Sequence, residues 1–222
     1  MTVGVVVPAA GAGTRLGPGL PKALRLLAGE PLLVHAVRRL LDCPSVGCVV
    51  VAAPPTQVAE VAALLPGAHV VAGGAERQDS VAAALAALPA EVDLVLVHDA
   101  ARALVPVEVV EDVVARLRAG AQAVIPVLAV SDTVKQVDVD GVVVRTVPRA
   151  DLRSAQTPQG FTRQALEAAH RAAGAALTDD AGLVEAQGVP VLTVAGSPYA
   201  FKITTPFDLL LAEAVLGSGS SA

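Results

Sequence analysis

The sequence predicts an α/β fold with a Rossmann-like, mostly parallel sheet flanked by helices. Short apolar runs rich in β-branched residues alternate with longer stretches of helical pattern along most of the 222 residues. The first run, residues 3–7, contains four valines, as expected of a strand buried on both faces. Polar residues collect just after these runs, where open parallel sheets bind ligands. The length fits a single domain over residues 1–222.

The remaining elements follow from the same alternation and from turn residues. Further strands are expected at residues 46–53, 69–72, 94–97, 123–127, 190–194 and 201–203. Helices are expected at residues 31–41, 57–65, 80–88, 107–119, 163–173, 180–187 and 206–216. Pro31 and Pro106 favour helix starts. Thr205 is the expected N-cap of the last helix.

Residues 133–147 interrupt this alternation with two valine-rich segments around Asp140 and Gly141, a dipeptide that favours a hairpin turn. An isolated hairpin is marginal in water, and no neighbouring segment has the pattern of a covering helix. We therefore predict a protruding β-hairpin dimerisation arm, inserted at about residues 131–149, which makes the protein a homodimer. The alternative is a hairpin folded back on its own domain.

Composition narrows the class of protein. The net charge of −5 argues against a general nucleic-acid surface. No apolar stretch reaches the length of a membrane span, and no signal peptide is visible, so a soluble, cytoplasmic protein is expected. The cysteines, Cys43 and Cys48, are not spaced as a metal motif.

A glycine-rich loop follows the first strand and predicts a polyphosphate cradle. Its small residues let a ligand approach backbone amides, and its two cations add positive charge. These residues are Ala9, Ala10, Gly11, Gly13, Arg15 and Lys22. The alternative is a plain tight turn between strand and helix. A dinucleotide fingerprint is disfavoured because Leu16 replaces its third glycine, and a P-loop because Lys22 follows Pro21 and precedes Ala23.

Polar clusters follow later strands in the same way. Gly73, Gly74 and Ser80 resemble a second backbone cradle, with a plain turn and N-cap as the alternative. Asp99 suits a metal–phosphate site or a helix N-cap, and the adjacent His98 is a weaker candidate.

Lys202 lies in an apolar stretch and needs a partner, either a phosphate or an internal acid such as Asp179. At the start of the predicted helix 180–187, we favour Thr178 as a ligand contact. Asp179 and Asp180 are expected to complement the helix dipole.

Taken in order, the motifs AAGAGTRLG, PK, GGAERQDSV, VLVHDAAR, SDTVK, QTPQGF, TDDAGLVE and FKITTP cover nearly the whole chain. The first resembles the loop of sugar-nucleotidyltransferase-like enzymes. The full set resembles the 2-C-methyl-D-erythritol 4-phosphate cytidylyltransferase family of the non-mevalonate isoprenoid pathway. The chain departs from that family's pattern at Ala200, where asparagine is frequent, and at Ala75, where an acid is common.

The resemblance implies transfer of CMP from CTP to 2-C-methyl-D-erythritol 4-phosphate, with release of pyrophosphate, in isoprenoid precursor biosynthesis. It also implies Mg²⁺ bound mainly through the CTP phosphates. The implied catalytic residues are Arg15, Lys22 and Lys202. The implied CTP-binding residues are Ala9, Ala10, Gly11, Gly13, Gly73, Gly74, Ala75, Ser80, Asp99 and Ala100. The implied substrate-binding residues are Thr133, Arg149, Thr157, Thr178 and Lys202, with Asp99 as the metal residue.

Other functions stay open at this point. Cytidylyl transfer to ribitol 5-phosphate uses most of the same motifs, and a nucleotidyltransferase that uses UTP or GTP is a broader alternative. A non-catalytic nucleotide-binding subunit is the alternative from another class, although Arg15 and Lys22 are both present.

Overall fold

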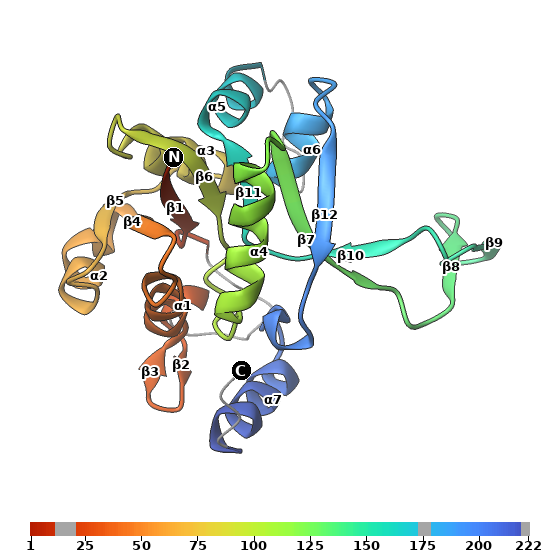
Figure 1. Ribbon diagram of the computed structural model, residues 1–222. Helices are drawn as coiled ribbons and strands as arrows, with labels where there is room; N and C mark the ends of the chain where they lie inside the picture. Colours follow the sequence, from red (N-terminus) through yellow and green to blue (C-terminus); the bar gives the residue numbers. More distant parts are fainter. Residues whose placement is uncertain (12–20, 173–178, 219–222) are drawn as a thin grey trace.

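The protein is built on one twisted sheet, seen in a computed structural model that describes residues 1–11, 21–172 and 179–218 (Figure 1). The sheet has eight strands in the order β10-β7-β11-β6-β1-β4-β5, with β12 also paired to β7. Its strands are β1 (Thr2–Pro8), β4 (Val46–Ala53), β5 (His69–Ala72), β6 (Val92–Val97), β7 (Ala123–Ala129), β10 (Arg153–Ala155), β11 (Gln159–Thr162) and β12 (Val191–Ala195). Only β10 and β11 pair antiparallel within it, so the predicted mostly parallel sheet is confirmed.

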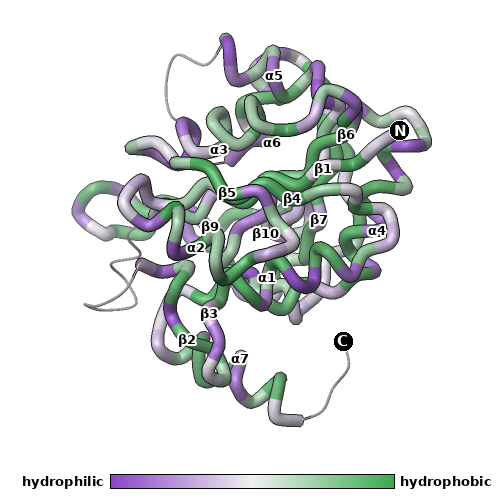
Figure 2. Tube along the Cα trace, turned by 90° about the vertical axis from the view of Figure 1, so that its left-hand side faces the viewer, coloured by the Kyte–Doolittle hydropathy of each residue, from purple (hydrophilic) through white to green (hydrophobic). Residues whose placement is uncertain are grey.

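Helices cover both faces of the sheet. On one face, α1 (Leu32–Leu41), α2 (Val58–Leu64) and α4 (Val107–Arg118) contribute to one hydrophobic cluster. On the other face, α3 (Arg77–Ala86), α5 (Arg163–Ala172) and α6 (Asp180–Glu185) contribute to a second cluster. Figure 2 shows the apolar strands enclosed between these layers. The predicted α/β architecture is therefore correct.

The valines of β1 show how one strand serves both layers. Successive side chains of a strand point to opposite faces of the sheet. Accordingly, Val5 and Val7 belong to the first cluster and Val6 to the second, and all three are completely buried. Fully burying a valine contributes at least about 1.5 kcal/mol, so this strand anchors the loop that follows it.

The arm segment forms the expected hairpin, β8 (Val134–Val137) paired with β9 (Val143–Val147). Gly141 in its turn has φ of +81°, a conformation that favours glycine. The hairpin stands away from the central sheet (Figure 1), and several of its valines are exposed, including Val139 and Val142. A dimeric role for it stays a prediction.

Two elements differ most from the sequence-based expectation. Helix α3 begins at Arg77 rather than at Ser80, because Glu76 and Asp79 form a capping box. The strand expected at residues 201–203 is wrong. The chain passes through a short 3₁₀ helix, η4 (Pro198–Ala200), and then extends without joining the sheet, and the Ile203 amide donates to the Ala101 carbonyl at 2.8 Å.

Smaller elements were not predicted from the sequence. They are β10, β11, the hairpin of β2 (Leu26–Leu27) with β3 (Glu30–Pro31), and the 3₁₀ helices η2 (Lys22–Leu24), η3 (Pro55–Gln57) and η4. Helix α7 (Pro206–Gly217) closes the described chain, with Thr205 as its N-cap as expected. Among the helices of the described ranges, none combines the length and the apolar character that a membrane span requires.

Candidate active site

A cavity of about 250 Å³ lies beyond the carboxyl ends of β1 and β6. The loop after β1, the start of α3, the loop after β6 and a single lysine from the C-terminal part enclose it. Its lining includes Ala9, Ala10, Gly11, Lys22, Gly74, Ala75, Arg77, Ser80, Asp99, Ala100 and Lys202. We call it the first cavity, and most of its wall is backbone and small side chains.

Close backbone packing explains the glycine pair after β5. A Cβ atom at Gly73 would lie 2.8 Å from both Ala10 Cβ and Ser80 Oγ, and one at Gly74 would lie 2.2 Å from Asp79 Cβ. The Ser80 hydroxyl accepts from the Gly74 amide at 3.2 Å and donates to the Glu76 carbonyl at 3.1 Å. This loop is therefore fixed against the start of α3.

A second cavity, of about 190 Å³, adjoins the first one. Its lining is Arg77, Asp99, Arg102, Ala155, Gln156, Thr157, Gln159, Asp179 and Lys202. In contrast to the first cavity, it is lined mainly by polar side chains from distant segments. Arg77, Asp99 and Lys202 line both cavities, so these three residues form the junction between them.

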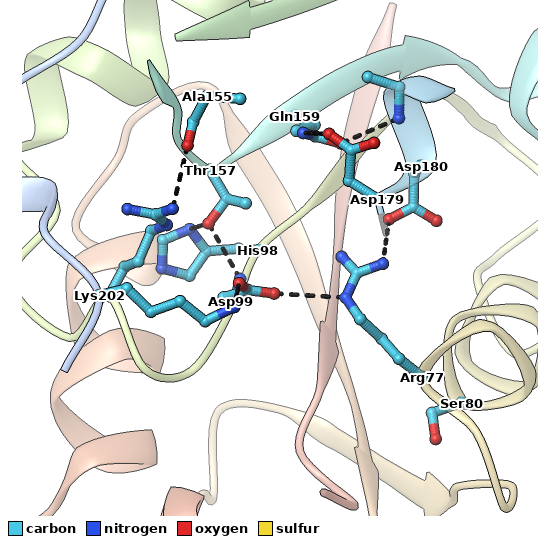
Figure 3. Close-up of polar contacts among 12 residues, drawn as sticks. Arg77, Ser80, His98, Asp99, Ala155, Thr157, Gln159, Asp179, Asp180 and Lys202 are labelled. Atoms are coloured by element: carbon cyan, nitrogen blue, oxygen red, sulfur yellow. Dashed lines mark hydrogen bonds and ion pairs between the residues drawn. The ribbon is translucent and has the colours of Figure 1, made fainter. Parts of the chain in front are cut away.

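The junction is held by ion pairs (Figure 3). Asp99 accepts from Lys202 Nζ at 2.7 Å and from Arg77 Nε at 3.4 Å. Burial alone would raise the pKa of Asp99, but the charges of Arg77 and Lys202 outweigh it and hold that pKa well below its usual value. Asp99 is thus the acid that Lys202 pairs with, and not Asp179 as considered from the sequence.

Arg77 also binds a second carboxylate, on its other side. Its Nη1 lies 2.7 Å from Asp180 Oδ2, and the other oxygen of Asp180 lies 3.0 Å from His170 Nε2. Burial opposes the charge of Arg77, but Asp180 and Asp99 raise its pKa overall. Asp179 caps α6 by accepting from the Gly182 amide at 3.1 Å. Both acids therefore lie at the start of α6, as expected, and Asp180 additionally pairs with Arg77.

His98 and Thr157 form a buried polar contact behind the second cavity. Thr157 Oγ1 lies 3.1 Å from His98 Nδ1 and accepts from the Asp99 amide at 3.0 Å. Burial lowers the pKa of His98 to about 4, so its imidazole is neutral near pH 7. His98 lines neither cavity and supports Thr157 from inside the protein.

Two arginines line the cavities without having been assigned a role from the sequence, namely Arg77 and Arg102. Arg102 donates to the carbonyls of Ala200 at 2.7 Å and Ala155 at 3.1 Å, which fixes its guanidinium at the wall of the second cavity. Both occur in polar motifs that follow strands, one after the glycine pair and one after His98 and Asp99. Their position just after a strand was the sequence signal that could have identified both arginines as site residues.

The remaining predicted residues either line neither cavity or lie outside the described residues. Thr133 and Arg149 are exposed at the base of the hairpin arm, where Arg149 donates to the Ser131 carbonyl, and they line neither cavity. Gly73 packs behind the first cavity. Gly13, Arg15 and Thr178 lie outside the described residues.

No cluster of three or more metal-ligating side chains occurs within residues 1–11, 21–172 and 179–218. Asp99 is the acid common to both cavities. A single carboxylate beside a phosphate site matches the way proteins hold Mg²⁺, which keeps several waters and binds substrate phosphates. Asp99 therefore fits a Mg²⁺ ion whose other ligands would be nucleotide phosphates and water.

Comparisons with known proteins give matches over nearly the whole chain. A model of the family described as "IspD: 2-C-methyl-D-erythritol 4-phosphate cytidylyltransferase" matches residues 3–218. The enzyme of that name from Frankia casuarinae is 58% identical over 96% of this chain and 81% of its own length. The one from Saccharopolyspora erythraea is 57% identical over 97% of this chain and its whole length. The crystal structure of the enzyme from Thermus thermophilus superposes with a TM-score of 0.81 at 40% identity, covering 97% of this chain and 98% of that one. The chain belongs to the 2-C-methyl-D-erythritol 4-phosphate cytidylyltransferase family.

Proposed function

We propose that the protein transfers CMP from CTP to 2-C-methyl-D-erythritol 4-phosphate and releases pyrophosphate, in isoprenoid precursor biosynthesis. The observation that carries this proposal is a pair of adjoining cavities with a charged junction. One cavity offers backbone and small residues to a nucleotide, and the other offers arginines, a lysine and the Thr157 hydroxyl to a polyol phosphate. The proposed location is the cytoplasm, where CTP is available.

The first cavity is assigned to CTP. Its wall of small residues leaves main-chain groups accessible, which suits a base that is recognised through those groups. Lys22 lies on the same wall and would bind the triphosphate. Arg15 and Gly13 are assigned to that triphosphate by the family motif alone. The base contacts are assigned to Ala9, Ala10, Gly11, Gly74, Ala75 and Ser80, and Ala100 is assigned to CTP as well. Gly73, which packs behind this cavity, is assigned to CTP by the family motif alone.

The second cavity is assigned to the acceptor. Arg102 and Lys202 supply positive charge for its phosphate, and Thr157 supplies a hydroxyl. Thr178 is assigned to the same substrate by the family motif.

The chemistry needs no general base. The second pKa of a phosphate monoester is about 6, so the acceptor phosphate is largely a dianion at neutral pH. One of its oxygens forms a bond to the α-phosphorus of CTP. The bond from that phosphorus to the oxygen bridging the β-phosphate breaks, and pyrophosphate leaves with the electron pair. The protein contributes alignment and cations that stabilise the charge developing at the α-phosphate.

Asp99, together with the CTP phosphates, would hold Mg²⁺ or a similar divalent ion. When bound, that ion supplies further stabilisation of negative charge on the phosphates. Asp99 also keeps Lys202 and Arg77 at the junction through its ion pairs.

The hairpin arm is assigned to a homodimer. Val142 and Val144 on the arm are 61% and 60% exposed, and an apolar hairpin of this kind gains stability by packing against a partner. Thr133 and Arg149 at its base would then reach the acceptor cavity of the partner subunit. Val142→Asp combined with Val144→Asp is expected to give monomers in sedimentation analysis, and an unchanged dimer would contradict this role.

The direct test is pyrophosphate release from CTP and Mg²⁺ with either 2-C-methyl-D-erythritol 4-phosphate or ribitol 5-phosphate. Turnover with the first acceptor supports the proposal. Turnover with ribitol 5-phosphate alone would keep the mechanism and change the pathway. If neither acceptor released pyrophosphate while CTP still bound, measured by calorimetry, the catalytic proposal would be wrong.

A further inference from the structure

We propose that Arg77 is a phosphate-binding residue at the junction of the two cavities, and that Asp180 is the positioning residue that aims it. This inference rests on the proposed function and deepens it. It adds to the reaction a cation from the start of α3 and a buried carboxylate from the start of α6, neither of which the sequence motifs assigned to a substrate.

Arg77 lies where it can reach a phosphate in either cavity. Its side chain lines both cavities and is 33% exposed. Its contacts with Asp99 and Asp180 use Nε and Nη1. A guanidinium carries five N–H donors, so donors remain for a ligand after both carboxylates are bound. Arg77 therefore has both the access and the donors to bind a phosphate.

The proposed reaction requires positive charge at the junction of the two cavities. A dianionic acceptor must approach a triphosphate, and the two anions meet where the cavities join. Among the three residues that line both cavities, Lys202 and Arg77 are cations. Planar guanidinium groups match phosphate oxygens by paired hydrogen bonds, which a lysine ammonium does not provide. Arg77 would thus lower the repulsion between the two substrates.

Arg77 is also held by a buried carboxylate that lines neither cavity. Asp180 is only 1% exposed, and His170, which is itself 7% exposed, contacts its other oxygen. These groups come from α3, α6 and α5, so the carboxylate is fixed by the packing of three helices. Figure 3 shows the guanidinium of Arg77 held between Asp99 and Asp180. A side chain fixed at two points is already oriented before substrates bind, which favours catalysis by positioning.

A purely structural role for the Arg77–Asp180 pair predicts a different result. A double variant distinguishes this role from phosphate binding. Removing one member of a buried ion pair leaves an uncompensated charge, whereas replacing both members by apolar residues is often neutral for stability. Arg77→Met alone is thus expected to destabilise the fold, and Arg77→Met with Asp180→Leu is expected to restore the melting temperature. If the pair only ties helices together, activity returns with stability.

The experiment measures kcat, both KM values and thermal unfolding with CTP, Mg²⁺ and 2-C-methyl-D-erythritol 4-phosphate. We expect kcat of the double variant to stay about 10²–10³-fold below wild type, the scale of one lost transition-state donor, although its melting temperature recovers. Asp180→Asn keeps the shape of the side chain and is expected to lower kcat about 10-fold, with the KM for CTP within about twofold of wild type.

Arg163→Met is the matched control. Arg163 also makes an ion pair, with Glu167 at 2.7 Å, and donates to the Pro89 carbonyl at 2.7 Å, but it lines neither cavity. Its kcat is expected to equal that of wild type. If the double variant does not fold, Arg77→Lys takes its place. The lysine ammonium still pairs with Asp180. Loss of the planar guanidinium, which can bind two phosphate oxygens at once, is expected to lower kcat at least about 10-fold.

The outcomes separate the two proposals. Wild-type kcat in a folded double variant, in Asp180→Asn or in Arg77→Lys would overturn this inference and leave the proposed function intact. Absence of pyrophosphate release by the wild-type protein would overturn the proposed function, and this inference with it.

Discussion

The two cavities that meet at Arg77, Asp99 and Lys202 are built in different ways. The first is lined by short contiguous segments whose small residues bring the backbone to the surface. The second is assembled from polar side chains that lie far apart in the chain. A backbone site depends on where the main chain passes, whereas a side-chain site depends on how several elements pack. Substitutions should therefore damage the first cavity by obstructing the main chain and the second by removing single side-chain contacts.

The largest effect is expected from Lys22→Ala, at the triphosphate end of the first cavity. Loss of one cation that stabilises the α-phosphate should lower kcat about 10²–10³-fold. Pyrophosphate release at saturating CTP and acceptor measures it. Arg118→Ala is the control, because Arg118 donates to Ser45 Oγ at 2.9 Å and lines neither cavity. An equal loss in both variants would contradict a specific role for Lys22.

Glycine substitutions test whether the first cavity is a backbone site. A Cβ atom at Gly74 would lie 2.2 Å from Asp79 Cβ, whereas one at Gly11 meets no atom of the described residues within 4 Å. Gly74→Ala should therefore lose about 1–3 kcal/mol of unfolding free energy and raise the KM for CTP. Gly11→Ala should raise that KM at unchanged stability, because the methyl group would occupy ligand space.

Urea unfolding and steady-state kinetics measure both quantities. Gly217→Ala is the control, since a Cβ atom there also meets nothing within 4 Å in the described part of the chain, and the residue lies at the end of α7. A Gly11→Ala protein with a wild-type KM for CTP would argue against main-chain recognition of the nucleotide.

The sequence predicted the first cavity better than the second for the same physical reason. A ligand site made of consecutive small residues leaves a contiguous motif, so Ala9, Ala10 and Gly11 could be assigned before the fold was known. The partner of Lys202 could not, because Asp99 comes close only after the sheet has formed and η4 has turned the chain. The pairing of Arg77 with Asp180 likewise depends on how α3 and α6 pack.

The fold shows a parallel difference. Buried parallel strands such as β1 and β4 are apolar runs, and both lie where the sequence predicts them. Strand β11 has no such run, since its sequence is QGFT. Gly160 is required there because a Cβ atom would lie 2.5 Å from Val113 of α4. That requirement comes from a helix crossing above the strand, and no local pattern encodes it.

Stability should depend on pH through His98, which is buried behind the second cavity. Its pKa is lowered to about 4 in the folded protein, against about 6.5 in an unfolded chain. The unfolded state therefore binds more protons between these values, and stability falls as the pH falls. The expected loss is about 2 kcal/mol between pH 7.5 and pH 5.

Urea unfolding at several pH values measures this slope. His98→Gln should remove the contribution, whereas His69→Gln, at an exposed position, should keep it. A His98→Gln protein that still loses the same free energy between pH 7.5 and pH 5 would assign the slope to other groups.

The smallest effect is expected from Thr157→Val, which keeps the shape of the side chain and removes its hydroxyl from the second cavity. The Asp99 amide loses its acceptor at 3.0 Å, and the acceptor substrate loses a hydrogen-bonding group. One such lost bond corresponds to a rise of about 10-fold in the KM for the acceptor. Thr162→Val is the control, because Thr162 lies at the end of β11 and lines neither cavity. Since the first cavity does not include Thr157, the KM for CTP should stay within about twofold of wild type. An equal rise in both KM values would mean that the two cavities act as one site, and the contrast between them would fail.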